Sequence, residues 1–263
     1  MKKNNAFILM LCLLIGTSLR SFAQDTTVVV STGPIKTHMF TFGVGYSYLN
    51  GTAPLNTFLA PTTPEGFSQN FGILSLQHTT ECKRFIYGWT LQAGMSQKVD
   101  VANYAGVAGQ NMEYSASYGN VLMNFGYAII STNRVKFYPI IGAGFAGING
   151  NYNRTDDLTA AQFANNPNVS GSVSKYMMSF DGALALDLLM PSKRWSTPNS
   201  TKGHVIGLRV GYNQGIGVGN WTYAGAKITD NPGYNPQMFY VKLQFGLFGK
   251  KPKEEWAAHY RRK

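Results

Sequence analysis

The chain has little cysteine, little charge and few long apolar runs. Charged residues make up 13% of the 263 positions, about half the share found in a soluble domain. Beyond the N-terminal run, no segment offers the roughly 18 uninterrupted apolar residues that a transmembrane helix requires. Cys82 is the single cysteine outside the first 23 residues, which excludes an internal disulfide and a cysteine metal site there.

The N-terminal residues have the pattern of a cleaved secretory signal. Lys2 and Lys3 precede an apolar run from Ala6 to Ile15, which is too short to cross a membrane as a helix. Ser21-Phe22-Ala23 ends on the small residue that a signal peptidase site requires. We therefore expect residues 1–23 to be removed; a short membrane anchor is the alternative.

Glycine and aromatic residues are abundant, with 29 Gly, 16 Phe, 15 Tyr and 4 Trp. Apolar and polar residues alternate at period two in eight segments, which is typical of β-strands with two different faces. Pro139 lies inside the fifth segment and predicts a local bulge there. The eight segments are Thr37–Leu49, Asn70–Thr80, Arg84–Gln97, Tyr114–Ser131, Arg134–Asn149, Val173–Leu189, His204–Gly217 and Gln237–Gly249.

Short and long connections alternate along the chain, and the long ones are rich in Asn, Gly, Pro, Thr and Asp. Short turns at one end and long loops at the other are typical of an outer-membrane barrel. We therefore predict an all-β fold: a closed antiparallel up-and-down transmembrane β-barrel of eight strands. With an even strand number, both termini lie in the periplasm. Ten strands is the alternative, if Trp221 to Thr229 belongs to an added hairpin.

A soluble β-sandwich also alternates, so the composition of the polar face decides between the two. That face carries mainly Gly, Ser, Thr, Asn and Gln, whereas a solvated face would carry many Lys and Glu. Small uncharged residues fit a narrow lumen, and the apolar residues at the alternate positions fit a surface in contact with lipid. The predicted organisation is signal peptide 1–23, periplasmic N-terminal segment 24–36, barrel 37–248 and basic periplasmic tail 249–263.

A few charges fall on the polar parity, and an eight-stranded barrel is only wide enough to hold its own side chains. Lys242 and Arg209 are predicted to point inward, with Asp181 and Asp187 as counter-charges. A buried charge without a partner would be costly. We expect a lumenal ion-pair cluster that holds the barrel together; a proton or ion path is the alternative.

The sequence gives no pattern for catalysis, a cofactor or a metal ion. All four histidines, His38, His78, His204 and His259, fall at or near the predicted periplasmic side, so a Ser-His-acid site at the outer rim is unsupported. The net charge is +11, and most of the positive residues beyond the signal fall on the predicted periplasmic side, where they would meet anionic lipid head groups. We expect no nucleic-acid partner.

Four segments carry a family resemblance: FTFGVGYSY from Phe40, YPIIGAGFAG from Tyr138, IGLRVGYN from Ile206 and FYVKLQFGLF from Phe239. The chain resembles outer-membrane β-barrel proteins of the OmpA/OmpX type and the PorT-like barrels of the Bacteroidota. The resemblance implies outer-membrane lipid and the barrel-insertion machinery as partners, with Phe248 in the place of the final aromatic residue that this machinery reads. It implies a non-enzymatic structural or surface-binding role; a transport or secretion-system component is the alternative.

Overall fold

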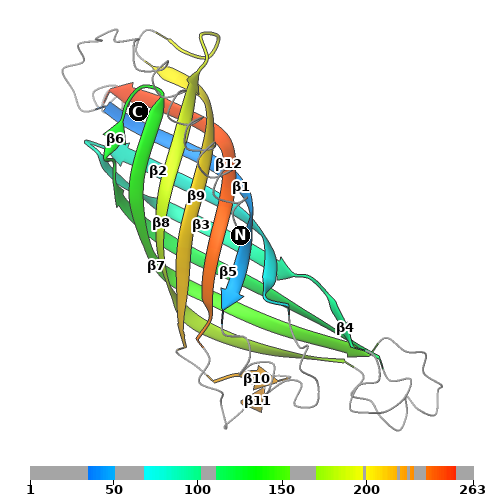
Figure 1. Ribbon diagram of the computed structural model, residues 1–263. Helices are drawn as coiled ribbons and strands as arrows, with labels where there is room; N and C mark the ends of the chain where they lie inside the picture. Colours follow the sequence, from blue (N-terminus) through cyan, green and yellow to red (C-terminus); the bar gives the residue numbers. More distant parts are fainter. Residues whose placement is uncertain are drawn as a thin grey trace, which may run out of the picture.

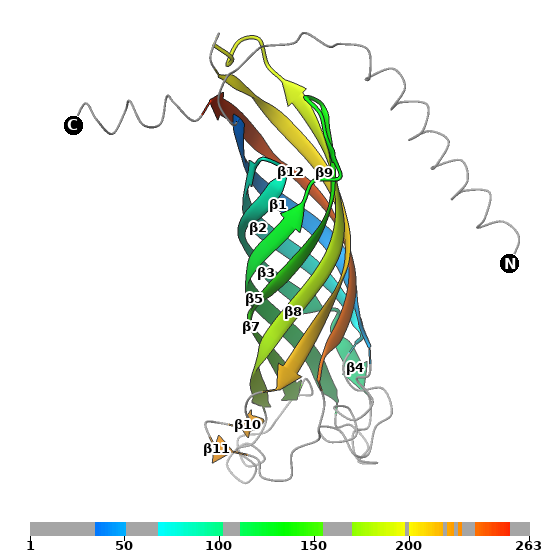
Figure 2. The ribbon, with the colours of Figure 1, turned by 90° about the vertical axis from the view of Figure 1, so that its left-hand side faces the viewer.

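The computed structural model describes residues 35–50, 68–101, 111–154, 170–197, 200–217, 220–223, 226–227 and 235–252. These residues form a cylinder of antiparallel strands (Figures 1 and 2). The predicted signal peptide, most of the 24–36 segment and residues 253–263 of the tail lie outside the described residues. No helix in the described part of the chain is long and apolar enough to cross a membrane.

Eight long strands form the cylinder, and each pairs with the next along the chain. The strands are β1 (Ile35–Asn50), β2 (Asn70–Cys82), β3 (Phe85–Ser96), β5 (Met112–Tyr127), β7 (Val135–Arg154), β8 (Ser170–Pro191), β9 (Thr201–Gly217) and β12 (Gln237–Pro252). Because β12 also pairs with β1 along its whole length, the sheet closes into a barrel. The predicted fold class, a closed eight-stranded up-and-down barrel, is confirmed.

The register fixes the width of the barrel. A path that starts at Met39 on β1 and passes on each strand to the directly opposed residue of the next strand returns to β1 at Leu49. The path therefore ends ten residues away from its starting point. With eight strands, this displacement corresponds to a strand tilt of about 40° and a backbone radius of about 8 Å. Side chains alone can fill a lumen of that width.

The barrel has two different ends. The terminal end is where β1 begins and β12 ends, and the loop end is opposite. At the loop end β5, β7 and β8 extend furthest, and β4 (Val99–Val101) pairs with the start of β5 (Figure 1). Strands β10 (Thr222–Tyr223) and β11 (Ala226–Lys227) form a small hairpin there, beside β8. The hairpin adds two short strands to the edge of β8, so the barrel keeps eight strands and the ten-strand alternative does not hold.

The strand limits differ from the predicted ones at several points. The first strand begins at Ile35 and the last ends at Pro252, so β-structure extends beyond the predicted range 37–248. The segment predicted as one strand to Ser131 divides into β5 and β6 (Ile130–Ser131). β7 is continuous through Pro139, and the bulge lies in the neighbouring β5–β6 segment instead. There, the four residue steps from Gly126 to Ile130 are opposed by only three on β7, from Ile140 to Phe137. Since proline has no N–H to donate, the ladder breaks on its partner's side.

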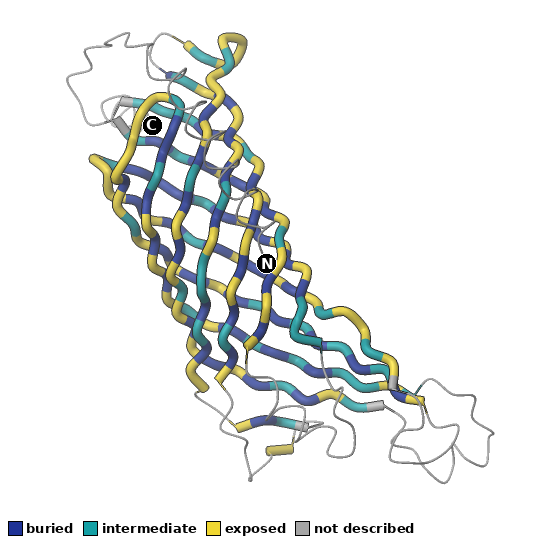
Figure 3. Tube along the Cα trace, viewed as in Figure 1, coloured by how far each residue is buried: buried dark blue, intermediate teal, exposed yellow. Residues whose placement is uncertain are grey.

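The outer surface of the barrel carries a band of apolar side chains. On β12 the outward residue Val241 exposes 48% of its surface, whereas its neighbour Lys242 exposes 3%. The same alternation of exposed and buried positions follows every long strand (Figure 3). Exposed aromatic and aliphatic residues occupy the outward positions on all eight strands, whereas at the loop end of β8 serine residues such as Ser172 replace them. This band has the composition of a lipid-facing surface.

Candidate functional site: the barrel lumen

The four charged residues predicted to face the lumen all do so. Arg209 and Lys242 are directly opposite each other on β9 and β12, with 4% and 3% of their surfaces exposed. Asp181 and Asp187 lie on the inner face of β8, and Asp187 is buried. The period of two places all four on the inner face, and Asp181 and Asp187 lie on either side of Ala185, the β8 residue that is directly opposite Arg209.

A tyrosine joins Arg209 to Asp187. The Arg209 guanidinium donates to Tyr138 Oη at 2.9 Å, and Tyr138 Oη donates to Asp187 Oδ2 at 2.6 Å. Within the described residues, no nitrogen of Arg209 forms an ion pair with either aspartate. The expected direct ion pair is therefore replaced by a relay through a phenol, which separates the two charges while both remain hydrogen-bonded. Such bonds to charged groups are stronger than neutral ones.

A second tyrosine organises the other two charges. Tyr240 donates to Asp181 Oδ2 at 2.9 Å, and Lys242 Nζ lies 4.6 Å from the centre of the Tyr240 ring. Lys242 also donates to Gln92 Oε1 at 2.9 Å. Each of these two cations, Arg209 and Lys242, thus lies against an aromatic ring and a hydrogen-bond acceptor, which offsets part of the cost of desolvation.

Further polar side chains connect strands that are not neighbours. Tyr118 on β5 donates to Asn213 on β9 at 2.8 Å, and Gln244 on β12 donates to Gln77 on β2 at 2.9 Å. We call these residues the polar layer: Gln77, Gln92, Tyr118, Tyr138, Asp181, Asp187, Arg209, Asn213, Tyr240, Lys242 and Gln244. Since its bonds cross the axis of the barrel, side chains occupy the centre of the lumen.

The sequence indicated Tyr138 and Tyr240 only by their polar-face parity, and it did not identify them as the links between the charges. It also missed a buried ion pair near the terminal end, where Lys136 on β7 contacts Glu81 on β2. Ser131 donates to the same carboxylate at 2.6 Å. Glu81 and Lys136 both fall on the polar parity of their strands, and this was the available signal.

The terminal end is closed by a second set of contacts. Lys250 on β12 donates to the carbonyl of Thr132 at 3.4 Å and to Asn133 Oδ1 at 3.2 Å, in the β6–β7 turn on the opposite side of the barrel. Four buried apolar side chains pack together at this end: Met39, Leu189, Val205 and Phe248. With Glu81 and Lys136 they form what we call the terminal layer.

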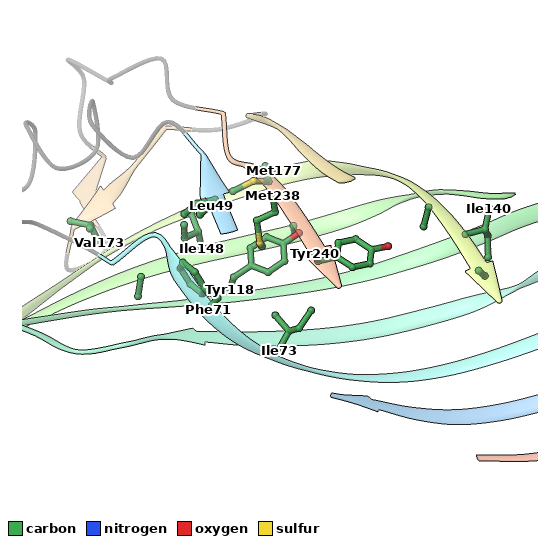
Figure 4. Close-up of a cluster of buried hydrophobic side chains, with 14 of the residues drawn as sticks. Leu49, Phe71, Ile73, Tyr118, Ile140, Ile148, Val173, Met177, Met238 and Tyr240 are labelled. Carbon is green, nitrogen blue, oxygen red and sulfur yellow. The ribbon is translucent and has the colours of Figure 1, made fainter. Parts of the chain in front are cut away.

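Apolar side chains fill the loop end of the lumen (Figure 4). We call them the apolar layer: Leu49, Phe71, Ile73, Tyr114, Ile148, Val173, Met177, Trp221 and Met238. Trp221 comes from the β9–β12 connection and is fully buried, and Lys175 Nζ lies 5.7 Å from the centre of its ring. Sequence reasoning predicted a polar lumen throughout, so this layer was missed. The parity of Phe71, Ile73 and Met238 was visible, but their depth in the barrel was not.

The described residues show no arrangement for metal binding or nucleophilic catalysis. Across them, no three His, Cys, Asp or Glu side chains come together so that they could hold a metal ion. His38 and His78 stack on each other with ring centroids 6.0 Å apart, on the outward parity of β1 and β2 near the terminal end. His204 lies against Trp195, also near the terminal end, and His259 lies outside the described residues.

A closed eight-stranded barrel with a filled lumen is thus the class that the fold and site define. No protein-family model and no curated protein matches the sequence. Solved structures with a similar course of the chain include the attachment invasion locus protein Ail of Yersinia pestis, at 14% identity over 81% of this chain and 97% of that one, with a TM-score of 0.40. A major outer membrane protein of Thermus thermophilus has 11% identity, coverage of 81% and 98%, and a TM-score of 0.38. The outer membrane protease OmpT of Escherichia coli has 6% identity, coverage of 87% and 100%, and a TM-score of 0.30.

Proposed function

We propose that this protein is a non-enzymatic barrel of a bacterial outer membrane, with a structural or surface-binding role and no open channel. The band of outward apolar side chains supports the membrane location, because a closed sheet leaves no unpaired edge inside the bilayer. The terminal end, with its short turns, faces the periplasm. The loop end faces the exterior, where the long connections are available to a partner.

The observation that carries this proposal is the filled lumen. The polar layer crosses the axis through bonds such as Tyr118 to Asn213 and Lys242 to Gln92. The apolar layer and the terminal layer occupy the lumen on either side of it. A solute would have to break several charge-assisted bonds in a barrel of about 8 Å radius.

Conductance in planar bilayers tests the proposal. We expect the folded protein to insert without giving stable single-channel steps at physiological salt. The matched sample is a double variant, Tyr118→Ala with Lys242→Ala, in which two of the bonds that cross the axis are removed; it should conduct more often than the wild type. Steady conductance by the wild-type protein would instead support the alternative role in transport or secretion.

A further inference from the structure

We infer that the outer surface at the terminal end, across β12, β1 and the β2–β3 turn, binds the phosphate of an anionic phospholipid. This inference rests on the proposed membrane location. The residues of this surface, which we call the rim cluster, are Lys36, His38, His78, Lys83, Arg84 and Lys251.

Strand pairing brings like charges together in the rim cluster. Lys36 on β1 lies directly opposite Lys251 on β12, and both side chains are on the outward parity. On its other side Lys36 lies opposite Cys82, the last residue before the β2–β3 turn. Like charges directly opposite each other on paired strands destabilise a sheet. The pairing therefore places two cations side by side on the outward face of the sheet.

The β2–β3 turn adds two cations at a backbone position that disfavours them. Lys83 and Arg84 have φ values of 51° and 71°, and two-residue turns of this type prefer Asn and Gly. Both side chains are exposed at the end of the hairpin, and Lys83 directly follows Cys82, the residue opposite Lys36. The turn therefore has a strained backbone, and its two side chains add positive charge to the same surface.

The carboxylates of the described strands lie in other places. Glu81, Asp181 and Asp187 face the lumen, and Asp100 and Glu113 lie at the loop end. Within the described residues, the charge on the outer face at the terminal end is therefore positive. A lipid phosphate supplies the complementary charge, and phosphates lie at this level of a bilayer.

A row of aromatic rings lies on the bilayer side of these cations. Ring centroids are 6.0 Å apart for His38 and His78, 6.2 Å for His78 and Trp89, and 6.4 Å for Trp89 and Phe40. His38 Nδ1 is hydrogen-bonded to Thr80 Oγ1 at 2.9 Å, which fixes the first ring. Aromatic rings of this kind lie at the head-group level of membranes. The cations lie at the level of a lipid phosphate, and the aromatic rings lie next to them on the bilayer side, at the level where the acyl chains begin.

Native mass spectrometry of the full chain, purified in detergent and supplied with phosphatidylglycerol or phosphatidylcholine, tests the site. We expect wild-type protein to retain phosphatidylglycerol in preference. The double variant Lys36→Gln with Lys251→Gln should weaken that retention about 30-fold, the effect of two cations at a membrane surface. The matched control, Lys193→Gln with Arg194→Gln, removes the same charge from the exposed β8–β9 turn and should keep the preference.

Equal retention of both lipids by the wild type would overturn the inference. An equal loss in the control variant would also overturn it, because the effect would then come from net charge. A second variant, Lys83→Asn with Arg84→Gly, separates binding from folding: it should retain less lipid while its melting temperature rises, whereas a misfolded variant would lose both. Since retention is measured in detergent, a conducting wild-type barrel would refute the proposed function and leave this result standing.

Discussion

At the scale of single residues, close contact between strands requires glycine at particular inward positions. A Cβ atom added to Gly144 on β7 would lie 1.9 Å from the carbonyl oxygen of Val121 on β5. The substitution Gly144→Ala should therefore lower the free energy of unfolding by about 1–3 kcal/mol, the range for overpacking. Urea titration of the folded barrel in lipid vesicles measures this loss.

Gly182 on the outer face of β8 provides the control, because nothing lies within 4 Å of an added Cβ atom there. Gly182→Ala should leave the urea midpoint almost unchanged. Equal effects of the two substitutions would show that the loss of a glycine in itself, and not contact with Val121, determines the cost.

The aspartates of the polar layer give a second prediction at this scale. In the double variant Asp181→Asn with Asp187→Asn, the lumen keeps Arg209 and Lys242 but loses both negative charges. Leaving buried cations uncompensated costs about 3–5 kcal/mol, so the melting temperature should fall by several degrees. Heat-dependent mobility on gels follows this transition; Asp100→Asn at the loop end is the control, and an unchanged melting temperature would contradict a stabilising role for the cluster.

Period-two parity was sufficient to place Arg209, Lys242, Asp181 and Asp187 in the lumen. It could not identify the tyrosine links, because Tyr138 and Tyr240 suit either face: a tyrosine carries both an apolar ring and a hydroxyl group. Which hydroxyl meets which carboxylate depends on distances across the lumen. Those distances follow from the register of all eight strand pairs, and no local pattern contains them.

At the scale of elements, the described residues of the segment containing Trp221 pair with the barrel over a short length. Thr222 and Tyr223 pair with two residues of β8, the Ser174 and Thr222 hydroxyls are 2.8 Å apart, and the indole of Trp221 is fully buried. Trp221→Ala should release this segment without unfolding the barrel, because the closed ladder of eight strands does not include it. Trypsin cleavage after the exposed Lys227 should become faster in intact membranes.

Trp195→Ala, at the terminal end, is the matched control and should not change cleavage after Lys227. Loss of the heat-resistant folded form in the Trp221 variant would show that the indole supports the barrel itself. The sequence indicates a hairpin near Trp221 only in the ten-strand alternative, in which the hairpin would belong to the barrel. The strands are too short for that, because each of β10 and β11 has only two paired residues.

At the scale of the whole molecule, the lumen has three layers with different chemistry. The apolar layer lies at the loop end, where β5, β7 and β8 extend beyond the apolar outer band and need a core of their own. The polar layer lies at the height of the band, where the outward residues are apolar and the inward residues include the charges. Counting alternating segments predicted closure and strand number, but the layering depends on the ten-residue displacement around the barrel, which tilts each strand through all three heights.

The apolar outer band leads to a prediction about the protein as a membrane component. Leu243 lies in the middle of the outward series on β12, from Phe239 to Leu247. A lysine on the lipid face at the bilayer midplane costs about 2–4 kcal/mol, so Leu243→Lys should lower the free energy of unfolding in vesicles by that amount. The chain already contains a lysine one residue earlier, at Lys242, because that side chain points into the lumen.

Ser172→Lys, also outward but beyond the band at the loop end of β8, should have almost no effect. Urea titration of the two variants in vesicles compares the costs, and equal losses would mean that the band does not lie in hydrocarbon.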